Sequence, residues 1–284
     1  LKISFLIFLM FLGGSYYALT SVYLSESAQL SELTGDGYNG AYVYNAAGCA
    51  SCHMVKGSED RLSLAGGQSF GSEFGIFYAP NISMSLTHGI GAWRLDQFAA
   101  ALRDGVSPEG EHYFPAFPYT DYEKMTDQDI VDLWTFWQTL PAVETENNEH
   151  DIFFPFSIRR NLGIWKLLYT DVRYVSQEGT RGAYLVEALG HCAQCHTPRD
   201  ILGGLDKSRW MKGAPSPDGR GNIPAISPSQ LKWSAEEISE FLTTGFTPEY
   251  DVVGGHMAAV VDNMLRLTSE DRDAIATYLK KLPD

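Results

Sequence analysis

The sequence predicts a mainly α-helical chain in which two tandem domains follow an N-terminal helix. Three observations support this fold class. The first 25 residues hold a long apolar stretch, the remainder of the chain repeats itself, and the repeated segments carry apolar residues at helical spacing. We place the N-terminal segment at residues 1–25, the first domain at 36–143, a linker with a helix at 144–175, and the second domain at 176–284.

The composition is that of a globular, acidic protein. A chain of 284 residues is long enough for two domains of roughly 100 to 150 residues each. Its 44% apolar and 20% charged residues are typical of folded domains. The 35 acidic residues outnumber the 21 lysines and arginines, which gives a net charge of −14. This charge disfavours nucleic acid as a partner and favours a protein partner with a basic docking face.

The N-terminal segment is predicted to cross a membrane. Residues 3–24 contain no charged side chain and follow Lys2. A helix of this length would span roughly 33 Å, which is enough to cross a bilayer. We expect an uncleaved transmembrane anchor with Lys2 on the cytoplasmic side. A cleavable signal peptide, with small residues near positions 25–28, is the alternative.

The two domains are predicted to be copies of one unit. Gly40-Ala41-Tyr42 recurs as Gly182-Ala183-Tyr184, and a helix opened by Trp93 and closed by Gly105 recurs between Trp233 and Gly245. The last helix of each unit starts at a capping threonine, Thr126 or Thr268, and ends at a proline, Pro141 or Pro283. Two unrelated helical modules would not reproduce three helices at nearly constant offsets.

The linker combines a polar stretch with an apolar helix. Residues 144–151 are mostly polar and acidic, and Phe153-Phe154-Pro155-Phe156 follows them. A helix is predicted over 158–169, with Ile158, Leu162, Trp165 and Tyr169 along one stripe. We expect this stripe to pack between the domains. A groove for a partner protein is the alternative.

All four cysteines lie in two copies of one pentapeptide, Cys49-Ala50-Ser51-Cys52-His53 and Cys192-Ala193-Gln194-Cys195-His196. Each is a C-x-x-C-H signature of c-type haem attachment. Two thiols one helical turn apart can each add to a vinyl group of one porphyrin, while the next histidine reaches the iron. A zinc site would not require histidine after both pairs, and a redox dithiol would require a βαβ setting. We therefore predict two covalently bound haem c groups, with His53 and His196 as iron ligands.

The second axial ligand is less well defined by the sequence. A methionine thioether is expected. Met257, which follows Gly254-Gly255-His256 in a loop before the last helix, is predicted for the second domain. The register set by Trp93 and Trp233 places Phe117 opposite Met257, and phenylalanine cannot bind iron. Met125 is predicted for the first domain, with Met84 and His112 as the alternatives.

The unused ring nitrogen of each iron-binding histidine should be held by a backbone carbonyl. For the second haem we expect that carbonyl to belong to Pro198, two residues beyond His196.

Several further motifs resemble a known family, the two-haem cytochromes c that serve as subunits of membrane-bound alcohol and gluconate dehydrogenases. The resemblance covers the chain from about Gly37 to the end and rests on the following segments: Arg181–Glu187, Gly190–Arg199, Phe154-Pro155-Phe156 followed by Trp165-Lys166, Pro80-Asn81-Ile82, Pro115–Tyr119 and Thr139–Val143.

This resemblance implies two class I cytochrome c-like domains. It also implies an electron-transfer subunit that is not itself an enzyme, acting between a dehydrogenase and quinone, a soluble cytochrome or a terminal oxidase. We accordingly expect the anchor in a bacterial inner membrane, the haem domains in the periplasm, and membrane dehydrogenase or oxidase subunits as partners.

Two other functions remain open at this point. An accessory dihaem subunit of a terminal oxidase also combines an N-terminal anchor with two haems. A dihaem peroxidase would require one iron with an open or displaceable distal site, which the undecided ligand of the first haem leaves possible.

Overall fold

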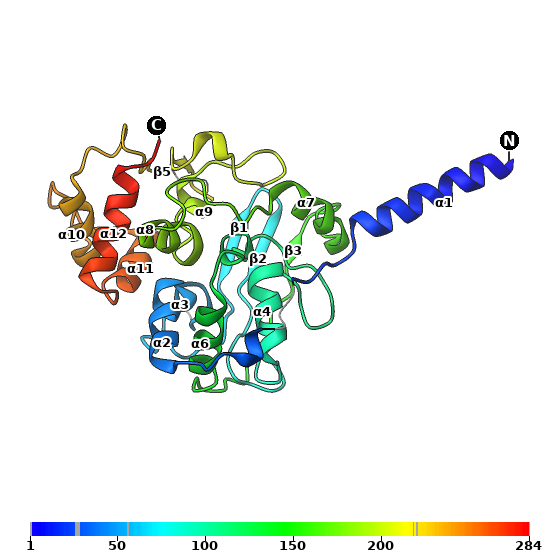
Figure 1. Cartoon of the computed structure of the whole chain (residues 1–284), viewed down its shortest axis with the longest axis horizontal. Helices are drawn as coiled ribbons and strands as arrows, with labels where there is room; N and C mark the ends of the chain where they lie inside the picture. Colours follow the sequence, from blue (N-terminus) through cyan, green and yellow to red (C-terminus); the bar gives the residue numbers. More distant parts are fainter. Residues whose placement is uncertain (1, 26–28, 56, 218, 220, 284) are drawn as a thin grey trace.

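The computed structural model describes residues 2–25, 29–55, 57–217, 219 and 221–283. It shows two helical domains in contact and one long N-terminal helix, α1 (Lys2–Leu19), which projects away from them (Figure 1). Residues 26–28, where the small residues of a signal-peptide cleavage site were noted, lie outside the described residues.

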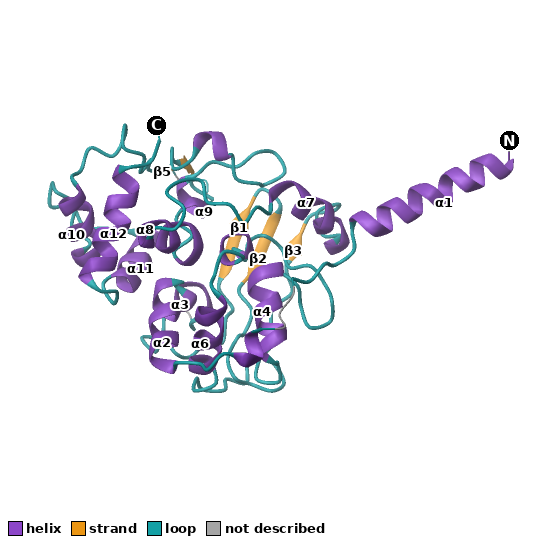
Figure 2. Ribbon diagram, viewed as in Figure 1, coloured by secondary structure: helices purple, strands orange, loops and turns teal. Residues whose placement is uncertain are grey.

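The described residues of the first domain form five α-helices and a β-hairpin. Figure 2 shows that helices dominate both domains and that the strands β1, β2 and β3 stand beside them. The elements are η1 (Leu30–Glu32), α2 (Gly37–Ala46), α3 (Cys49–His53), β1 (Ser69–Ser72), β2 (Gly75–Tyr78), α4 (Leu95–Asp104), α5 (Tyr119–Tyr122) and α6 (Asp127–Trp137). β1 and β2 pair antiparallel, and the linker strand β3 (Asp151–Ile152) pairs with β2.

The second domain repeats the helical elements with shorter strands. They are α8 (Arg181–Ala183), η3 (Tyr184–Leu189), α9 (Ala193–His196), η4 (Lys207–Arg209), β4 (Ala214–Pro215), β5 (Asn222–Ile223), α10 (Ala235–Thr244), α11 (Gly255–Met264) and α12 (Ser269–Lys280). Thr126 and Thr268 cap α6 and α12 as predicted, and Ser234 and Glu237 form a capping box on α10.

The linker helix packs between the two domains. It consists of η2 (Arg159–Asn161) and α7 (Leu162–Tyr169), so it begins later than predicted. The indole of Trp165 lies against Tyr119 of the first domain, and its Nε1 donates to the Leu202 carbonyl of the second. The Tyr169 hydroxyl donates to Asp200. The expected interdomain packing is therefore confirmed for Trp165 and Tyr169, whereas Ile158 stays exposed.

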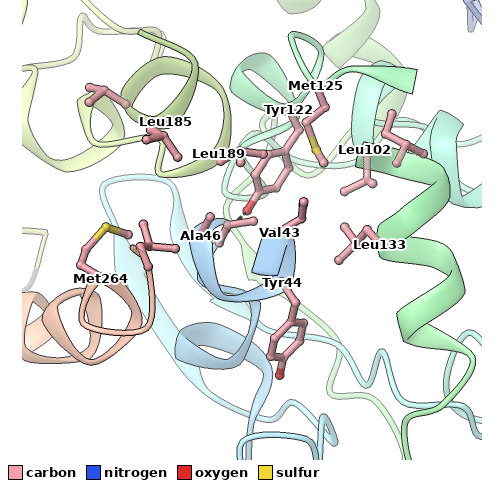
Figure 3. Packing of buried hydrophobic residues seen from close by; sticks show 14 of the residues in the cluster. Val43, Tyr44, Ala46, Leu102, Tyr122, Met125, Leu133, Leu185, Leu189 and Met264 are labelled. Atoms are coloured by element: carbon pink, nitrogen blue, oxygen red, sulfur yellow. Dashed lines mark hydrogen bonds between the residues drawn. The ribbon is translucent and has the colours of Figure 1, made fainter. Parts of the chain in front are cut away.

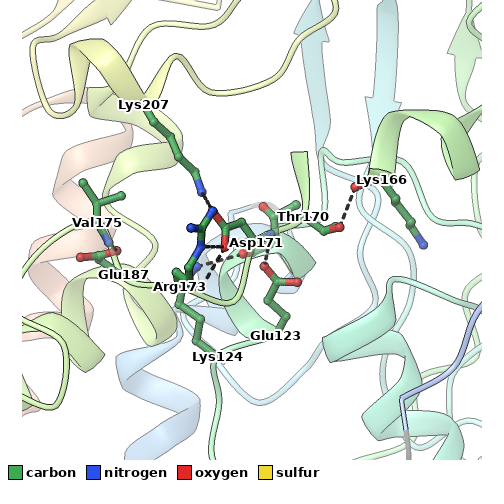
Figure 4. Close-up of polar contacts among 10 residues, drawn as sticks. Glu123, Lys124, Lys166, Thr170, Asp171, Arg173, Val175, Glu187 and Lys207 are labelled. Carbon is green, nitrogen blue, oxygen red and sulfur yellow. Dashed lines mark hydrogen bonds and ion pairs between the residues drawn. The ribbon is translucent and has the colours of Figure 1, made fainter. Parts of the chain in front are cut away.

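A polar network reinforces the linker just after α7. The Asp171 backbone donates to Glu123 at the end of α5, and Lys207 in η4 donates to the Asp171 carboxylate (Figure 4). Arg173 also pairs with that carboxylate and, by donating to it, lowers the pKa of Asp171. The linker is thus hydrogen-bonded to both domains.

Glycines allow the first and last helices of each domain to approach closely. A Cβ on Gly40 of α2 would lie 2.6 Å from the Asp132 carbonyl carbon of α6. A Cβ on Gly182 of α8 would lie 2.9 Å from Tyr278 Cβ of α12. Both distances are below ordinary van der Waals contact, so only glycine permits these helix crossings. The repeated Gly-Ala-Tyr segment therefore marks the same crossing in both domains.

Between the Gly-Ala-Tyr segment and the C-x-x-C-H motif, the second domain has one residue more than the first. Tyr42 and Tyr184 differ by 142 positions, whereas Cys49 and Cys192 differ by 143. The structure accommodates the insertion in η3, a π-helical turn at Tyr184–Leu189, where the first domain has a regular α-helix. An inserted residue widens a helix into such a turn.

Two tyrosines, one from each domain, make equivalent hydrogen bonds to the opposite domain. The Tyr42 hydroxyl donates to Asp271 at 2.5 Å and accepts from the Thr268 backbone at the start of α12. Tyr184 makes the equivalent contacts in the opposite direction, to Asp129 and the Thr126 backbone. The two domains therefore contact each other through like surfaces, as subunits related by a two-fold axis do.

The apolar core is continuous across this interface. Figure 3 shows Ala46 of α2 between Leu189 of η3 and the region of Met264 in α11, while Val43 and Leu133 lie on the first-domain side. The buried cluster spans both domains, so the domain interface is part of the hydrophobic core.

Candidate haem-binding sites

The first C-x-x-C-H motif forms the short helix α3. Gly48 precedes it with φ 67°, a left-handed conformation that glycine adopts at little cost. The Nδ1 atom of His53 lies 2.8 Å from the carbonyl oxygen of Pro80. Because a carbonyl can only accept, Nδ1 carries the proton and Nε2 keeps the lone pair that a metal requires. Burial lowers the pKa of His53, which favours this neutral imidazole.

The second motif reproduces this arrangement in α9. His196 Nδ1 lies 2.7 Å from the Pro224 carbonyl oxygen, and burial lowers the pKa of His196. The assignment of that carbonyl to Pro198 was wrong, because the Pro198 carbonyl accepts from the Asp206 backbone. The correct signal was present in the sequence. Pro80 follows His53 by 27 residues, and Pro224 follows His196 by 28.

The four thiols fit covalent attachment of a macrocycle. Cys49 and Cys192 are half-buried, and Cys52 and Cys195 are exposed. Burial raises the pKa of Cys49 and of Cys192 to about 12, so both are thiols at neutral pH. Among the described residues, no three histidine, cysteine, aspartate or glutamate side chains gather in a way that could hold a metal ion. A zinc site shared by the four cysteines is therefore not formed, whereas each pair of thiols with its neutral imidazole fits a haem c.

Met257 lies in the first turn of helix α11 and not in a loop, so the predicted loop before the last helix was wrong. Met257 is half-buried and packs against the core cluster of both domains. Met264, at the other end of α11, is buried. Met211 is fully buried, and its carbonyl accepts from Ile226, as the Leu64 carbonyl does from Ile82 in the first domain. Met211 therefore fills the packing position of Leu64.

In the first domain, the backbone confirms the register that places Phe117 opposite Met257. Tyr113 donates to the Gly105 carbonyl at 2.7 Å, and Val253 donates to that of Gly245 at 2.8 Å. The donor residue of each hydrogen bond, Tyr113 or Val253, lies four residues before Phe117 or Met257. The Phe117 ring packs on Tyr113 and Tyr122.

Met125 is 3% exposed, and Figure 3 shows its thioether among Val43, Leu102 and Leu133. Met125 directly precedes the capping Thr126, as the buried Leu267 precedes the capping Thr268, so Met125 has the backbone position of a core leucine. Its role as an iron ligand stays a prediction.

The alternative ligands of the first haem occupy different surroundings. His112 is buried, and its Nε2 lies 3.1 Å from the Thr20 carbonyl oxygen at the end of the N-terminal segment. Met84 is half-buried and packs against the core.

The second motif packs against α5 of the first domain at the domain interface. The ring centroids of Tyr122 and His191 are 5.6 Å apart, and Gln194 of the second motif donates to Asp121. Burial, with a smaller effect of the neighbouring Cys195, raises the pKa of the Cys52 thiol to about 11. Sequence reasoning gave His191 no role. His191 directly precedes Cys192, as Gly48 directly precedes Cys49, and both residues have a left-handed φ, 37° and 67°. This equivalent position was the signal in the sequence that His191 lies at the haem motif.

Comparison with known proteins agrees with this geometry. The cytochrome c family model matches residues 38–141 and 180–283. The chain is 48% identical over 278 residues to a protein of Cereibacter sphaeroides described as "Diheme cytochrome c-type", covering 95% of this chain and 94% of that protein.

Two further relatives are named as subunits of dehydrogenases. The fructose dehydrogenase cytochrome subunit of Gluconobacter japonicus is 36% identical over 254 residues, or 86% of this chain and 52% of that protein. The gluconate 2-dehydrogenase cytochrome c subunit of Pantoea cypripedii is 34% identical over 288 aligned positions, or 94% of this chain and 65% of that protein. The chain therefore spans about half to two thirds of these two relatives.

Proposed function

Because the chain belongs to the cytochrome c family and carries two of its domains in tandem, we propose that it is a membrane-anchored cytochrome that passes electrons from a dehydrogenase to the respiratory chain. It is a dihaem cytochrome c related to dehydrogenase cytochrome subunits, which are electron-transfer components. The observation that carries the proposal is the pair of C-x-x-C-H helices, each with its histidine held by a proline carbonyl.

The residues of each motif have separate tasks. Cys49 and Cys52 would hold one haem and Cys192 and Cys195 the other, with His53 and His196 as iron ligands. When bound, haem supplies an iron centre that gains and loses one electron reversibly. The Pro80 and Pro224 carbonyls fix the orientation of each imidazole and keep its Nε2 unprotonated.

We propose Met257 as the second ligand in the second domain and Met125 as that in the first. A thioether is neutral and soft and favours ferrous iron, which raises the reduction potential. Met257 lies at a half-buried position in the first turn of a helix. Met125 lies at a buried position beside Val43, Leu102 and Leu133.

The contacts of α1 favour a retained anchor. α1 is apolar and long enough to cross a membrane, and none of its residues is buried. The segment after it is held firmly: Thr20 is buried, its carbonyl contacts His112, and its hydroxyl accepts from Arg160 Nε at 2.8 Å. A signal peptide that is removed would not need these contacts between Thr20 and the folded domain. The haem domains would then lie on the periplasmic side of a bacterial inner membrane.

A dehydrogenase is the proposed electron donor, and quinone, a soluble cytochrome or a terminal oxidase is the acceptor. The named relatives support a dehydrogenase partner. The net charge of −14 favours a basic docking face on the protein that exchanges electrons with this one.

Isolation of the native complex in mild detergent tests this proposal. A large flavin, quinoprotein or molybdenum subunit that copurifies, and whose substrate reduces both haems, is the expected result. A variant with Cys192 and Cys195 replaced by alanine should retain the partner and lose one haem. Copurification with a copper–haem oxidase subunit, or rapid binding of cyanide to one haem with peroxide turnover, would contradict the proposal and support one of the two alternative functions.

A further inference from the structure

The exposed side of α7 is apolar, which is unusual for a surface helix. Leu167 and Leu168 are 65% and 61% exposed, and Ile164 on the same side is 38% exposed. The only charged side chain of the helix points the other way. Lys166 Nζ donates to the Asp104 and Gly105 carbonyls at the end of α4, lies 4.8 Å from the centre of the Tyr119 ring, and burial lowers its pKa to about 8. In a helix that faces water, the lysine would point outward and the leucines would point toward the protein.

The loop before α7 extends this apolar surface. Phe153 and Phe154 are 59% and 81% exposed, and Phe156 is also exposed. We define the apolar strip as Phe153, Phe154, Phe156, Ile164, Leu167 and Leu168. Exposed apolar side chains gathered on one helix and the loop that leads into it mark a surface that binds a partner or a membrane.

The charge of the segment differs from that of the rest of the chain. Residues 152–170 contain no aspartate or glutamate and three basic residues, Arg159, Arg160 and Lys166, in a protein with a net charge of −14. Arg160 is exposed at the start of the helix. Apolar side chains beside exposed arginine match a surface of anionic phospholipid.

The strip lies where α1 leaves the folded domains. The Tyr16 hydroxyl donates to Asn161 at 2.9 Å, Arg160 stacks on the Tyr17 ring, and Gly163 of α7 packs on the Thr20 backbone. Figure 1 shows α7 beside the base of the projecting α1. If α1 crosses a bilayer, these contacts hold α7 at the level where the chain emerges from it.

We propose that the apolar strip of α7 and the Phe153–Phe156 loop inserts into the surface of an anionic lipid bilayer beside the anchor. This contact would fix the tilt of the two haem domains on the membrane. The inference rests on the proposed role of α1 as a membrane anchor. A side-lying helix of this kind enters to a depth of about 5–10 Å at the boundary of headgroups and acyl chains.

Spin labelling of the full holoprotein in nanodiscs of phosphatidylethanolamine and phosphatidylglycerol tests the proposal. A single added cysteine is the only free thiol once both haems are attached. Leu168→Cys reports on the strip, and Tyr250→Cys is the control, because Tyr250 is 86% exposed in the second domain between α10 and α11. Leu9→Cys reports on α1 itself. Each label is compared by its relative accessibility to oxygen, which concentrates in lipid, and to a water-soluble nickel chelate.

The expected result is a label at 168 about 5–10 Å below the phosphates, a label at 250 in water and a label at 9 in the bilayer interior. A label at 168 as accessible to nickel as that at 250, with the label at 9 in lipid, would overturn the lipid contact and leave the anchor standing. A label at 9 in water would refute the anchor and the lipid contact together. A label at 168 that becomes protected only when a dehydrogenase subunit is added would assign the strip to a protein partner and likewise overturn the proposal.

Discussion

The helix crossing at Gly40 yields a quantitative prediction. In Gly40→Ala the new methyl would lie 2.6 Å from the Asp132 carbonyl carbon and 2.7 Å from Phe136 Cβ, against an ordinary contact of 3.4–4 Å. Helices α2 and α6 must therefore separate by about 1 Å, which disturbs packing around Val43 and Leu133. Overpacking of this kind costs about 1–3 kcal/mol, and we expect the upper part of that range because the clash is with backbone.

The control lies in the same helix. At Gly37 the nearest atom to an added methyl is Thr135 Cγ2 at 3.9 Å, so Gly37→Ala should cost nothing and could add up to about 1 kcal/mol from helix propensity. Guanidinium unfolding of both variants, followed by circular dichroism and by the Soret band, gives the two free energies of unfolding. Values for Gly40→Ala and Gly37→Ala that agree within about 0.5 kcal/mol would refute the crossing geometry.

Three further predictions follow from individual contacts. Tyr42→Phe should lower the free energy of unfolding by about 1–3 kcal/mol, because Asp271 loses a donor at the domain interface; an unchanged chemical denaturation midpoint would contradict this. Burial raises the pKa of Glu123 from 4.5 to about 7, so the folded state holds the proton more tightly than the unfolded state. The free energy of unfolding should therefore fall as pH rises across that range, by about 3 kcal/mol at most. Glu123→Gln should remove this pH dependence in thermal melts recorded at a series of pH values. Met257→Leu should abolish the sulfur-to-ferric-iron charge-transfer band of one haem and lower its potential, whereas Met264→Leu should leave both unchanged in a spectroelectrochemical titration.

Much of the fold could be read from local patterns in the sequence. The duplicated Gly-Ala-Tyr segments, the threonine caps and the C-x-x-C-H pentapeptides are short-range signals, and each lies at a helix in the structure. Helix bounds were predicted less well, because α7 begins after residue 158 and α6 and α12 end at Trp137 and Lys280, before the prolines. The contacts that depend on tertiary structure were harder to predict. The carbonyl that holds His196 comes from Pro224, 28 residues away, and proximity in sequence wrongly favoured Pro198.

The interface between the domains could not be deduced from periodicity. In the sequence, Tyr42 and Tyr184 only mark the repeated segment, and the folded chain shows that their hydroxyls bind the opposite domain. The number of positions between equivalent residues of the two domains changes from 142 at Tyr42 and Tyr184 to 143 at Cys49 and Cys192. This change indicates an inserted residue, but only the structure shows that it forms the π-helical turn η3.

The central claim is that two haem groups are bonded through thioethers to this chain. Mass spectrometry of the denatured protein, after extraction with acidified acetone to remove any haem that is not covalently attached, tests it most directly. We predict the mass of the polypeptide plus two haem groups, falling by one haem in the Cys192→Ala, Cys195→Ala variant. A mass equal to that of the polypeptide alone would contradict the account.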